Sequence, residues 1–173
     1  MADFKLEHVF DANKKRHYLN DFLTVLHCHH YATLFTQLAL DAKELVDGTQ
    51  LLTESVEDVF SEVLSNYFKK NGISDAKAKM DIAVQMFSAI GMGKMTIVSG
   101  DEKGGEVVLP LAYVDEGWIK KWGKHKEPVN FIGAGYISGM FAAVFGKPSR
   151  TYKVTETQSK VMGAEQSHFK VTI

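Results

Sequence analysis

The sequence predicts an α+β fold in which N-terminal helices pack on an antiparallel sheet of four to five strands. In the first half, about 18–91, apolar residues recur at helical spacing. In the second half, about 94–173, short segments alternate apolar and polar residues around turns, and a glycine-rich helix precedes the last two strands. The 173 residues, 45% of them hydrophobic, fit a single domain, 1–173, with a sizeable core.

Three helices are expected in the first half. They cover about 18–46, 53–70 and 75–91. Asp47-Gly48 is expected to end the first helix, because Gly accepts the left-handed conformation without steric cost. Thr53 or Ser55 is the expected N-cap of the second helix.

The second half reads as strands and shorter helices. Strands over 94–99 and 106–109 are joined by a turn-rich loop, which predicts a hairpin. Helices are expected over 117–122 and 131–145, and the last two strands over 151–156 and 167–173. Runs of strands following runs of helices are typical of an α+β architecture.

Composition excludes several classes of protein. A net charge of −1 gives no electrostatic basis for nucleic-acid binding. No apolar run reaches the roughly 18 residues that a membrane span requires, and the segment from Met1 to His8 lacks the layout of a secretion signal. One cysteine, Cys28, cannot form an internal disulfide, so a reducing, cytoplasmic setting is expected.

The glycine-rich segment 133–139 resembles a dinucleotide-binding turn only superficially. Ser138 stands at the third glycine position, and too few residues follow to complete a nucleotide-binding domain. Gly135 and Gly139 instead mark a helix face with little side chain. Such a face packs closely on the sheet or another helix, or it leaves room for a ligand.

From about 111 to 173 the chain resembles the 4-vinyl reductase domain, a small-molecule-binding fold. The motifs that carry the resemblance are Gly117-Trp118, Trp122-Gly123, Pro128-Val129-x-Phe131, Gly135-Tyr136-x-x-Gly139 and Glu156-x-x-Ser159-x3-Gly163-x3-Ser167-x-Phe169. The fold also occurs in the sensors of aromatic-responsive bacterial activators and, more distantly, in transport-particle subunits. The resemblance implies an apolar ligand cavity between helices and sheet, and a homodimer.

The aromatic-sensing members of this family hold zinc with cysteines, and this chain departs from that pattern. The corresponding positions carry Asn130, Glu156, Ser159 and Ser167. Hydroxyl and amide groups are poor zinc ligands, and one carboxylate cannot hold a structural zinc. We therefore expect no metal here, and hydrogen bonds from serine and asparagine across the same strands.

A histidine-rich segment is the other concentration of chemistry. Helical spacing places His27 and His30 on one apolar stripe, next to Tyr31. Three roles are open for these histidines. They can be partly buried and hydrogen-bonded to the backbone or to Tyr31, they can be the polar groups of an apolar ligand cavity, or they can be ligands of haem or a transition metal. A metal would need a further partner such as His8, His17, His125 or His168. No cofactor is part of the main interpretation.

The expected function is binding of a hydrophobic or aromatic small molecule, by a sensor or a carrier. The expected ligand residues are His27, His30, Tyr31, Trp118, Trp122, Phe131 and Tyr136. Trp118 and Trp122 share a helix face, which is either core or ligand-facing. The alternative is an enzyme of reductase or hydrolase type acting on a tetrapyrrole or another small molecule, with the histidines as acid and base. No nucleophile elbow, H-E-x-x-H or redox-cofactor motif supports it.

Overall fold

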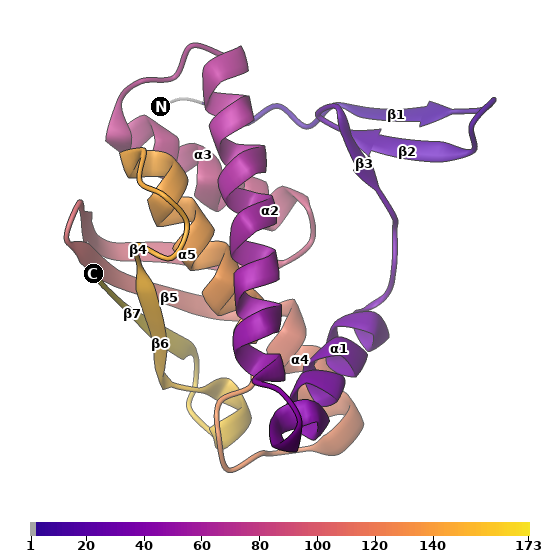
Figure 1. The fold of residues 1–173 in the computed structure, drawn as a ribbon, viewed down its shortest axis with the longest axis vertical. Coiled ribbons are helices and arrows are strands. Elements are labelled where there is room, and N and C mark those ends of the chain that lie inside the picture. The colour runs from indigo at the N-terminus through magenta and orange to yellow at the C-terminus, as the bar shows by residue number, and fades with distance from the viewer. Residues whose placement is uncertain (1–2) are drawn as a thin grey trace.

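The computed structural model describes residues 3–173, so Met1 and Ala2, the start of the segment without a secretion-signal layout, lie outside the description. The helices and strands form an α+β fold (Figure 1). The helices are α1 (His29–Asp41), α2 (Gly48–Lys70), α3 (Ala76–Ala89), α4 (Tyr113–Trp122) and α5 (Phe131–Phe145), with 3-10 turns η1 (Ala42–Glu44) and η2 (Lys160–Met162). The strands are β1 (His8–Asp11), β2 (Arg16–Leu19), β3 (Phe22–Thr24), β4 (Gly93–Asp101), β5 (Gly104–Ala112), β6 (Lys153–Gln158) and β7 (Ser167–Thr172).

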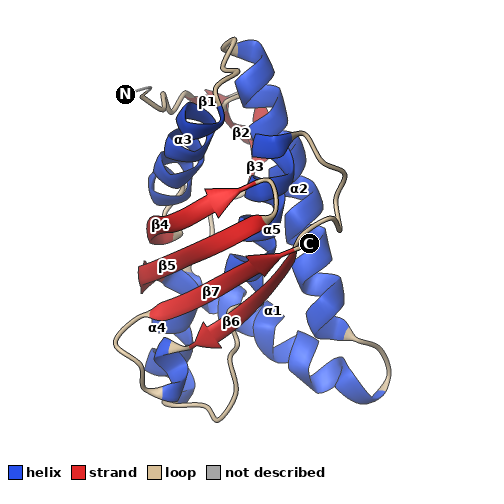
Figure 2. Ribbon diagram, turned by 90° about the vertical axis from the view of Figure 1, so that its left-hand side faces the viewer, coloured by secondary structure: helices blue, strands red, loops and turns tan. Residues whose placement is uncertain are grey.

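The main sheet has four antiparallel strands in the order β4-β5-β7-β6, which confirms the predicted antiparallel sheet. Helices lie behind it in Figure 2, so the molecule has a sheet layer and a helical layer. Strand β7 shows the alternation that such a layer requires. Ser167, Phe169 and Val171 are buried, whereas the residues between them are partly or fully exposed.

Helix α5 lies between the sheet and α2 and is buried along almost its whole length. Two of its glycines make this possible. A Cβ atom on Gly135 would lie 2.4 Å from the Thr53 carbonyl oxygen, and one on Gly139 would lie 2.6 Å from the Glu57 carbonyl oxygen. The glycine face is therefore a close-packed contact with α2, the first of the two roles that the sequence allowed.

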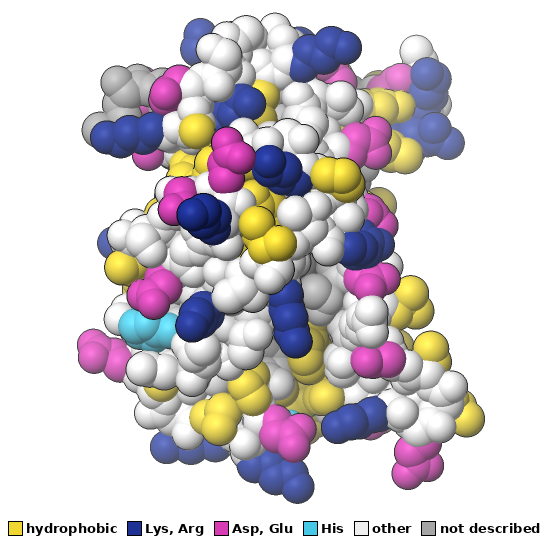
Figure 3. Space-filling model, turned by 60° about the vertical axis from the view of Figure 1, so that its left-hand side comes forward, with side chains coloured by type: hydrophobic (Ala, Val, Ile, Leu, Met, Phe, Trp, Pro, Cys, Tyr) yellow, Lys and Arg dark blue, Asp and Glu magenta, His cyan; other side chains and the backbone are white. Residues whose placement is uncertain are grey.

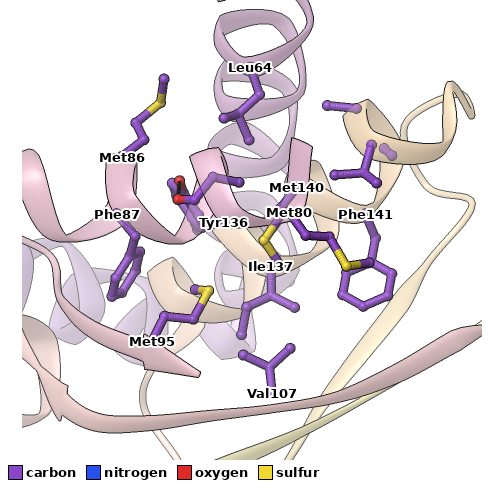
Figure 4. Close-up of a cluster of buried hydrophobic side chains, with 14 of the residues drawn as sticks. Leu64, Met80, Met86, Phe87, Met95, Val107, Tyr136, Ile137, Met140 and Phe141 are labelled. Atoms are coloured by element: carbon purple, nitrogen blue, oxygen red, sulfur yellow. Dashed lines mark hydrogen bonds between the residues drawn. The ribbon is translucent and has the colours of Figure 1, made fainter. Parts of the chain in front are cut away.

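The core between α3, α5 and the sheet is rich in flexible side chains. Met80, Met86, Met95 and Met140 are all buried there beside Phe87, as Figure 4 shows. Methionine side chains fill irregular space and rearrange easily. This core therefore combines close packing with an unusual capacity to repack.

The N-terminal part differs from the helix expected over 18–46. Residues 8–24 form a second sheet, β1-β2-β3, and the helix begins only at His29. Asn20 and Asp21 both have positive φ (48° and 72°), which makes a two-residue hairpin turn of the type that suits twisted strands. The spacing of Leu19, Phe22 and Leu23 fits a helix and a hairpin equally well, and the Asn-Asp turn decides between them.

The boundary between α1 and α2 also differs from the expectation. Asp47 does not end the first helix but caps the second, because its side chain accepts a hydrogen bond from the Gln50 backbone N–H. Helix α2 therefore starts at Gly48 rather than near Thr53. Within residues 3–173, none of the helices has the length and apolar character needed to cross a bilayer.

Candidate functional site

The structure distributes the expected ligand residues over four places. Tyr136 lies in the core, Trp118 and Trp122 line a surface pocket, and Phe131 begins α5. His27 and His30 are both at the surface, but His27 precedes α1, so the two do not share the helical stripe that the sequence predicted. The expected ligand residues therefore do not form one continuous cavity. Each place has its own chemistry.

Tyr136 is fully buried in the methionine-rich core. Its hydroxyl donates a 2.6 Å hydrogen bond to the carbonyl oxygen of Ala83 in α3. The ring packs against Phe60 and Phe87, with ring centroids 4.5 and 4.9 Å away. Burial raises the pKa of Tyr136, so the hydroxyl stays protonated and remains a donor. Tyr136 thus places one polar group inside an otherwise apolar region (Figure 4).

Trp118 and Trp122 lie one turn apart on α4, and their ring centroids are 4.7 Å apart. His125 adds an edge-on contact with Trp118 at 5.2 Å. The three rings, with Leu40 of α1, line an open pocket of about 440 Å³. Lysines complete its wall: Lys43, Lys124 and Lys126. Glu127 also lines the pocket, so it combines aromatic rings with charged groups of both signs.

Phe131 is the first residue of α5 and borders two grooves beside α2 and β6. One groove, of about 640 Å³, contains the ion-paired guanidinium of Arg150. The other, of about 370 Å³, reaches Asn130 and Glu156. Phe131 therefore borders the groove that reaches Asn130 and Glu156, whereas Tyr136 lines neither groove.

The histidine segment lies at the beginning of α1. Cys28 is the N-cap residue, and its sulfur is 3.3 Å from Nδ1 of His30. The ring of His27 packs on Tyr31, with the two centroids 5.3 Å apart. Among residues 3–173, no group of three or more His, Cys, Asp or Glu side chains is arranged to hold a metal ion.

A buried polar cluster occupies the positions that the sequence resemblance aligns with zinc ligands in the aromatic-sensing proteins. Asn130 caps α5, because its Oδ1 accepts a 2.9 Å hydrogen bond from the Gly133 N–H. Ser167 donates to Asp115 Oδ2 at 2.7 Å and accepts from the Lys160 N–H at 3.0 Å. The Ser167 bonds therefore join α4, η2 and β7. Asn130 instead bonds within its own helix, and the Ser159 hydroxyl has no partner among the described residues, so the predicted bonding between the strands is found only for Ser167.

Asp115 completes this cluster, and the sequence reasoning did not identify it. It is fully buried in the first turn of α4 and belongs to none of the family motifs. The available signal was its helical spacing from Trp118 and Trp122, which places the three residues on one face.

The two carboxyl groups of the cluster are held in their protonated forms more strongly than usual. Burial, and secondarily the nearby Asp115, raise the pKa of Glu156 to about 7. Burial also raises the pKa of Asp115. Burial thus favours the neutral form of both carboxyl groups.

The cluster also contains atoms with unused hydrogen-bonding capacity. Four of its buried side-chain atoms have no partner among the described residues: Asp115 Oδ1, Asn130 Nδ2, Glu156 Oε1 and Ser159 Oγ. Asn130 and Ser159 lie close enough to lower the pKa of Asp115 and Glu156, respectively. Small side-chain rotations would therefore complete these bonds within the cluster.

These residues do not fit a structural zinc ion. Zinc in such sites takes thiolate and imidazole ligands, often four of them. The cluster offers two acids whose pKa values are raised, two hydroxyls and an amide that already caps a helix. The chemistry of this donor set is that of a protonated hydrogen-bond network.

Comparison with known proteins places the fold. No family model matches the chain, and no curated protein matches it in sequence. Among solved structures, it is similar to the phenol-responsive sensory domain of the transcription activator PoxR in complex with phenol, with a TM-score of 0.78 and 14% identity over 95% of this chain and 84% of that one. The chain shares its fold with that domain.

Two further solved structures are similar to this chain in fold. A vinyl-4-reductase family protein from Methanocaldococcus jannaschii has a TM-score of 0.56 and 16% identity, over 86% of this chain and 83% of that one. A trafficking protein particle complex subunit 3 from Naegleria fowleri, covalently bound to palmitic acid, has a TM-score of 0.56 and 13% identity. That match covers 83% of this chain and 93% of the subunit. The relations predicted from the C-terminal motifs are therefore confirmed at the level of the fold.

Proposed function

We propose that this protein binds a small hydrophobic or aromatic molecule, as a sensor or carrier, and that it does so as a homodimer without a metal or cofactor. The fold supports the proposal, because similar solved structures include a sensory domain with phenol and a subunit carrying palmitic acid. The exposed, unpaired Cys28 is consistent with the reducing, cytoplasmic setting that belongs to the proposal.

The observation that carries the proposal is the hydroxyl of Tyr136 inside the methionine-rich core. Ligand sites combine apolar walls with a few placed polar groups. Tyr136 supplies such a group, and it donates its hydrogen bond to a backbone carbonyl oxygen, that of Ala83. The hydroxyl of a phenolic ligand at this place would accept a hydrogen bond from Tyr136 and donate one to the Ala83 carbonyl oxygen.

Room for a ligand would come from the methionines. Met80, Met86, Met95 and Met140 surround the region, and each has three rotatable side-chain bonds. A ligand the size of a single aromatic ring can then be admitted by rotamer changes in place of backbone movement. No reaction is part of the proposal, because His27 and His30 lie at the surface whereas Tyr136 is enclosed.

The test compares phenol with toluene, which has the same shape but cannot donate a hydrogen bond. Titration calorimetry should show tighter binding of phenol by the native protein. In Tyr136→Phe that preference should fall by about fivefold, since one buried hydrogen bond contributes roughly 1 kcal/mol. Because the preference is a ratio, a general loss of stability in the variant does not produce this result.

Two control variants separate the other expected ligand residues. Trp122→Ala removes part of the surface pocket, and the pair His27→Ala with His30→Ala removes the two histidines expected to bind the ligand. Both should leave the preference for phenol unchanged. If Trp122→Ala abolishes it and Tyr136→Phe does not, the ligand binds at the surface pocket and the core assignment is wrong. Metal analysis of the same native samples should find no stoichiometric zinc.

A further inference from the structure

The surface pocket beside α4 plays no part in the proposed function, although both tryptophans of the chain line it. Trp118 is buried and packs with Val129 and Val161, so it anchors the wall. Trp122 is 40% exposed, and the Lys121 ammonium lies 4.2 Å from the centroid of its ring. The pocket therefore has a supported aromatic wall in which one indole ring is partly open to a ligand.

The two sides of the pocket come from helices that are held close together. Gln37 and Leu40 of α1 line one side, and the tryptophans of α4 line the other. Next to Trp118, Gly117 lets the helices touch, since a Cβ there would lie 3.1 Å from the Thr33 side chain. The pocket is thus formed by the packing of the domain, and its volume of about 440 Å³ lies in the range of small-molecule sites.

Charged side chains of both signs surround the aromatic wall. Lys43 of η1 and Lys124 and Lys126 of the loop after α4 line the pocket, and so does Glu127. Among residues 3–173, none of these four side chains forms a salt bridge. In Figure 3, basic and acidic side chains both lie at the lower end of the molecule, where η1 and the loop after α4 lie in Figure 1. The pocket therefore offers cationic and anionic contacts to a ligand.

A ligand that matches this pocket carries an aromatic ring, an anionic group and a cationic group. The ring contacts the indole of Trp122, the anionic group faces the lysines, and the cationic group faces Glu127. A free aromatic amino acid has this combination at neutral pH, because its carboxylate and its ammonium are attached to one carbon. The apolar core around Tyr136 differs in this respect, since an unpaired charge is costly to bury there.

We propose that this pocket is a second binding site, which takes a free aromatic amino acid. The inference goes beyond the proposed function, because it concerns another place in the fold and a charged ligand. Trp122 binds the ring, Lys124 and Lys126 bind the carboxylate, and Glu127 binds the ammonium. The loop that carries these charges is tied to the wall through His125. Its ring contacts Trp118, and its Nδ1 lies 2.8 Å from the Glu127 backbone carbonyl oxygen.

The first experiment uses the tryptophan fluorescence of the chain, excited at the red edge of tryptophan absorption. Both tryptophans line the pocket, so the emission reports on this place. L-phenylalanine is the probe, because its ring does not absorb at that wavelength. It should change the emission saturably. Hydrocinnamate, which lacks the ammonium, and phenethylamine, which lacks the carboxylate, should each bind at least about fivefold more weakly, because each loses a charge-assisted contact.

The outcomes of this titration separate the classes of ligand. No saturable change with L-phenylalanine would overturn the proposal. Equal binding of all three compounds would mean that the pocket recognises the ring alone, and this also contradicts the assignment. If only one analogue binds as well as L-phenylalanine, the ligand carries a single charge and is not an amino acid.

The second experiment assigns the charged contacts by substitution. Glu127→Gln should remove the preference for L-phenylalanine over hydrocinnamate and keep the preference over phenethylamine. Lys124→Gln combined with Lys126→Gln should have the reverse effect. Glu44→Gln and Lys120→Gln are the matched controls, since both positions are exposed and neither lines the pocket. Preferences that persist in all of these variants would place the ligand elsewhere and overturn the proposal.

The third experiment separates this pocket from the core site. Tyr136→Phe should leave the binding of L-phenylalanine unchanged, because Tyr136 does not line the pocket. Trp122→Ala should weaken that binding by at least about fivefold, with Trp118 left as the reporter. Circular dichroism checks that each variant remains folded. Phenol titration of the same samples reports on the core site, so a failure of one site is distinguished from a failure of the other.

Discussion

Twelve of the fifteen residues of helix α5 are buried, whereas helix α1 directs its large apolar side chains to solvent. The two helices also begin differently. The N-cap of α5 is Asn130, whose side chain accepts a hydrogen bond from the helix, and the N-cap of α1 is Cys28, whose side chain makes no such bond. Helix α5 is thus completed by contacts within one chain.

The difference separates a helix that stabilises the isolated chain from a helix whose large apolar side chains are exposed. Helix α5 carries the glycine contact with α2, the Tyr136 hydroxyl and the start of the buried polar cluster. Substitutions there should affect the stability of the isolated chain. Substitutions of the exposed apolar side chains of α1 should affect that stability less, and the weak cap of this helix offers room for improvement.

The largest effect is expected from Gly135→Ala. The added Cβ would lie 2.4 Å from a backbone oxygen, which cannot move aside as a flexible side chain could. We expect a loss of at least about 3 kcal/mol in the free energy of unfolding, measured by urea titration. Gly146→Ala is the control, because its Cβ meets nothing within 4 Å and only the left-handed φ of 64° is unfavourable. That cost should be about 1–2 kcal/mol.

If the two alanine variants lose equal stability, the close contact between α5 and α2 is not what limits the packing. A gain of stability in Gly135→Ala would contradict the contact altogether.

The second prediction concerns the pH dependence of stability. The folded-state pKa of Glu156 is about 7, above its ordinary value of 4.5, so the folded state binds this proton more tightly than the unfolded state. The resulting stability is fully present below about pH 4.5 and is lost as the pH rises through 7. As the pH rises from 5 to 8, titration of this carboxyl should lower the free energy of unfolding by about 2–3 kcal/mol.

Glu156→Gln tests the assignment, because the amide imitates the neutral acid without titrating. The variant should show a flatter dependence of unfolding free energy on pH between 5 and 8. Glu165→Gln, at an exposed position in the same region, should keep the native slope. An unchanged slope in Glu156→Gln would show that another group holds the proton.

Part of this structure could be predicted from the sequence, and the limits have physical causes. The range 131–145 was predicted as a helix with the bounds found for α5, because its apolar run has clear ends at Asn130 and Gly146. Periodicity shows which residues share a face of a helix but not what that face meets, so the exposure of the apolar side chains of α1 could not be foreseen. Asp115 was missed because its proximity to Glu156 exists only in the folded chain.

The third prediction concerns the cap of α5. Asn130→Ala removes the acceptor for the Gly133 N–H and should cost about 1–2 kcal/mol in the free energy of unfolding. Asn130→Ser keeps an acceptor and should cost less. Asn130→Asp, normally a good cap, should be more destabilising than Asn130→Ser above pH 7, because it adds a third acid beside Asp115 and Glu156. A stabilising Asn130→Asp would show that these acids are not close enough to interact.

The smallest effect is expected at the N-cap of α1. Cys28 has extended backbone angles, with φ −82° and ψ 167°, which suit an N-cap, but its side chain accepts no bond from the helix. Cys28→Asp should add the missing acceptor and stabilise the chain by about 0.5–1 kcal/mol, measured by urea titration at one fixed protein concentration. Cys28→Ala removes the thiol without supplying an acceptor and should show no gain. Equal stability of the two variants would mean that α1 is held by its contacts with α2 and α4 alone, and that its first turn needs no cap.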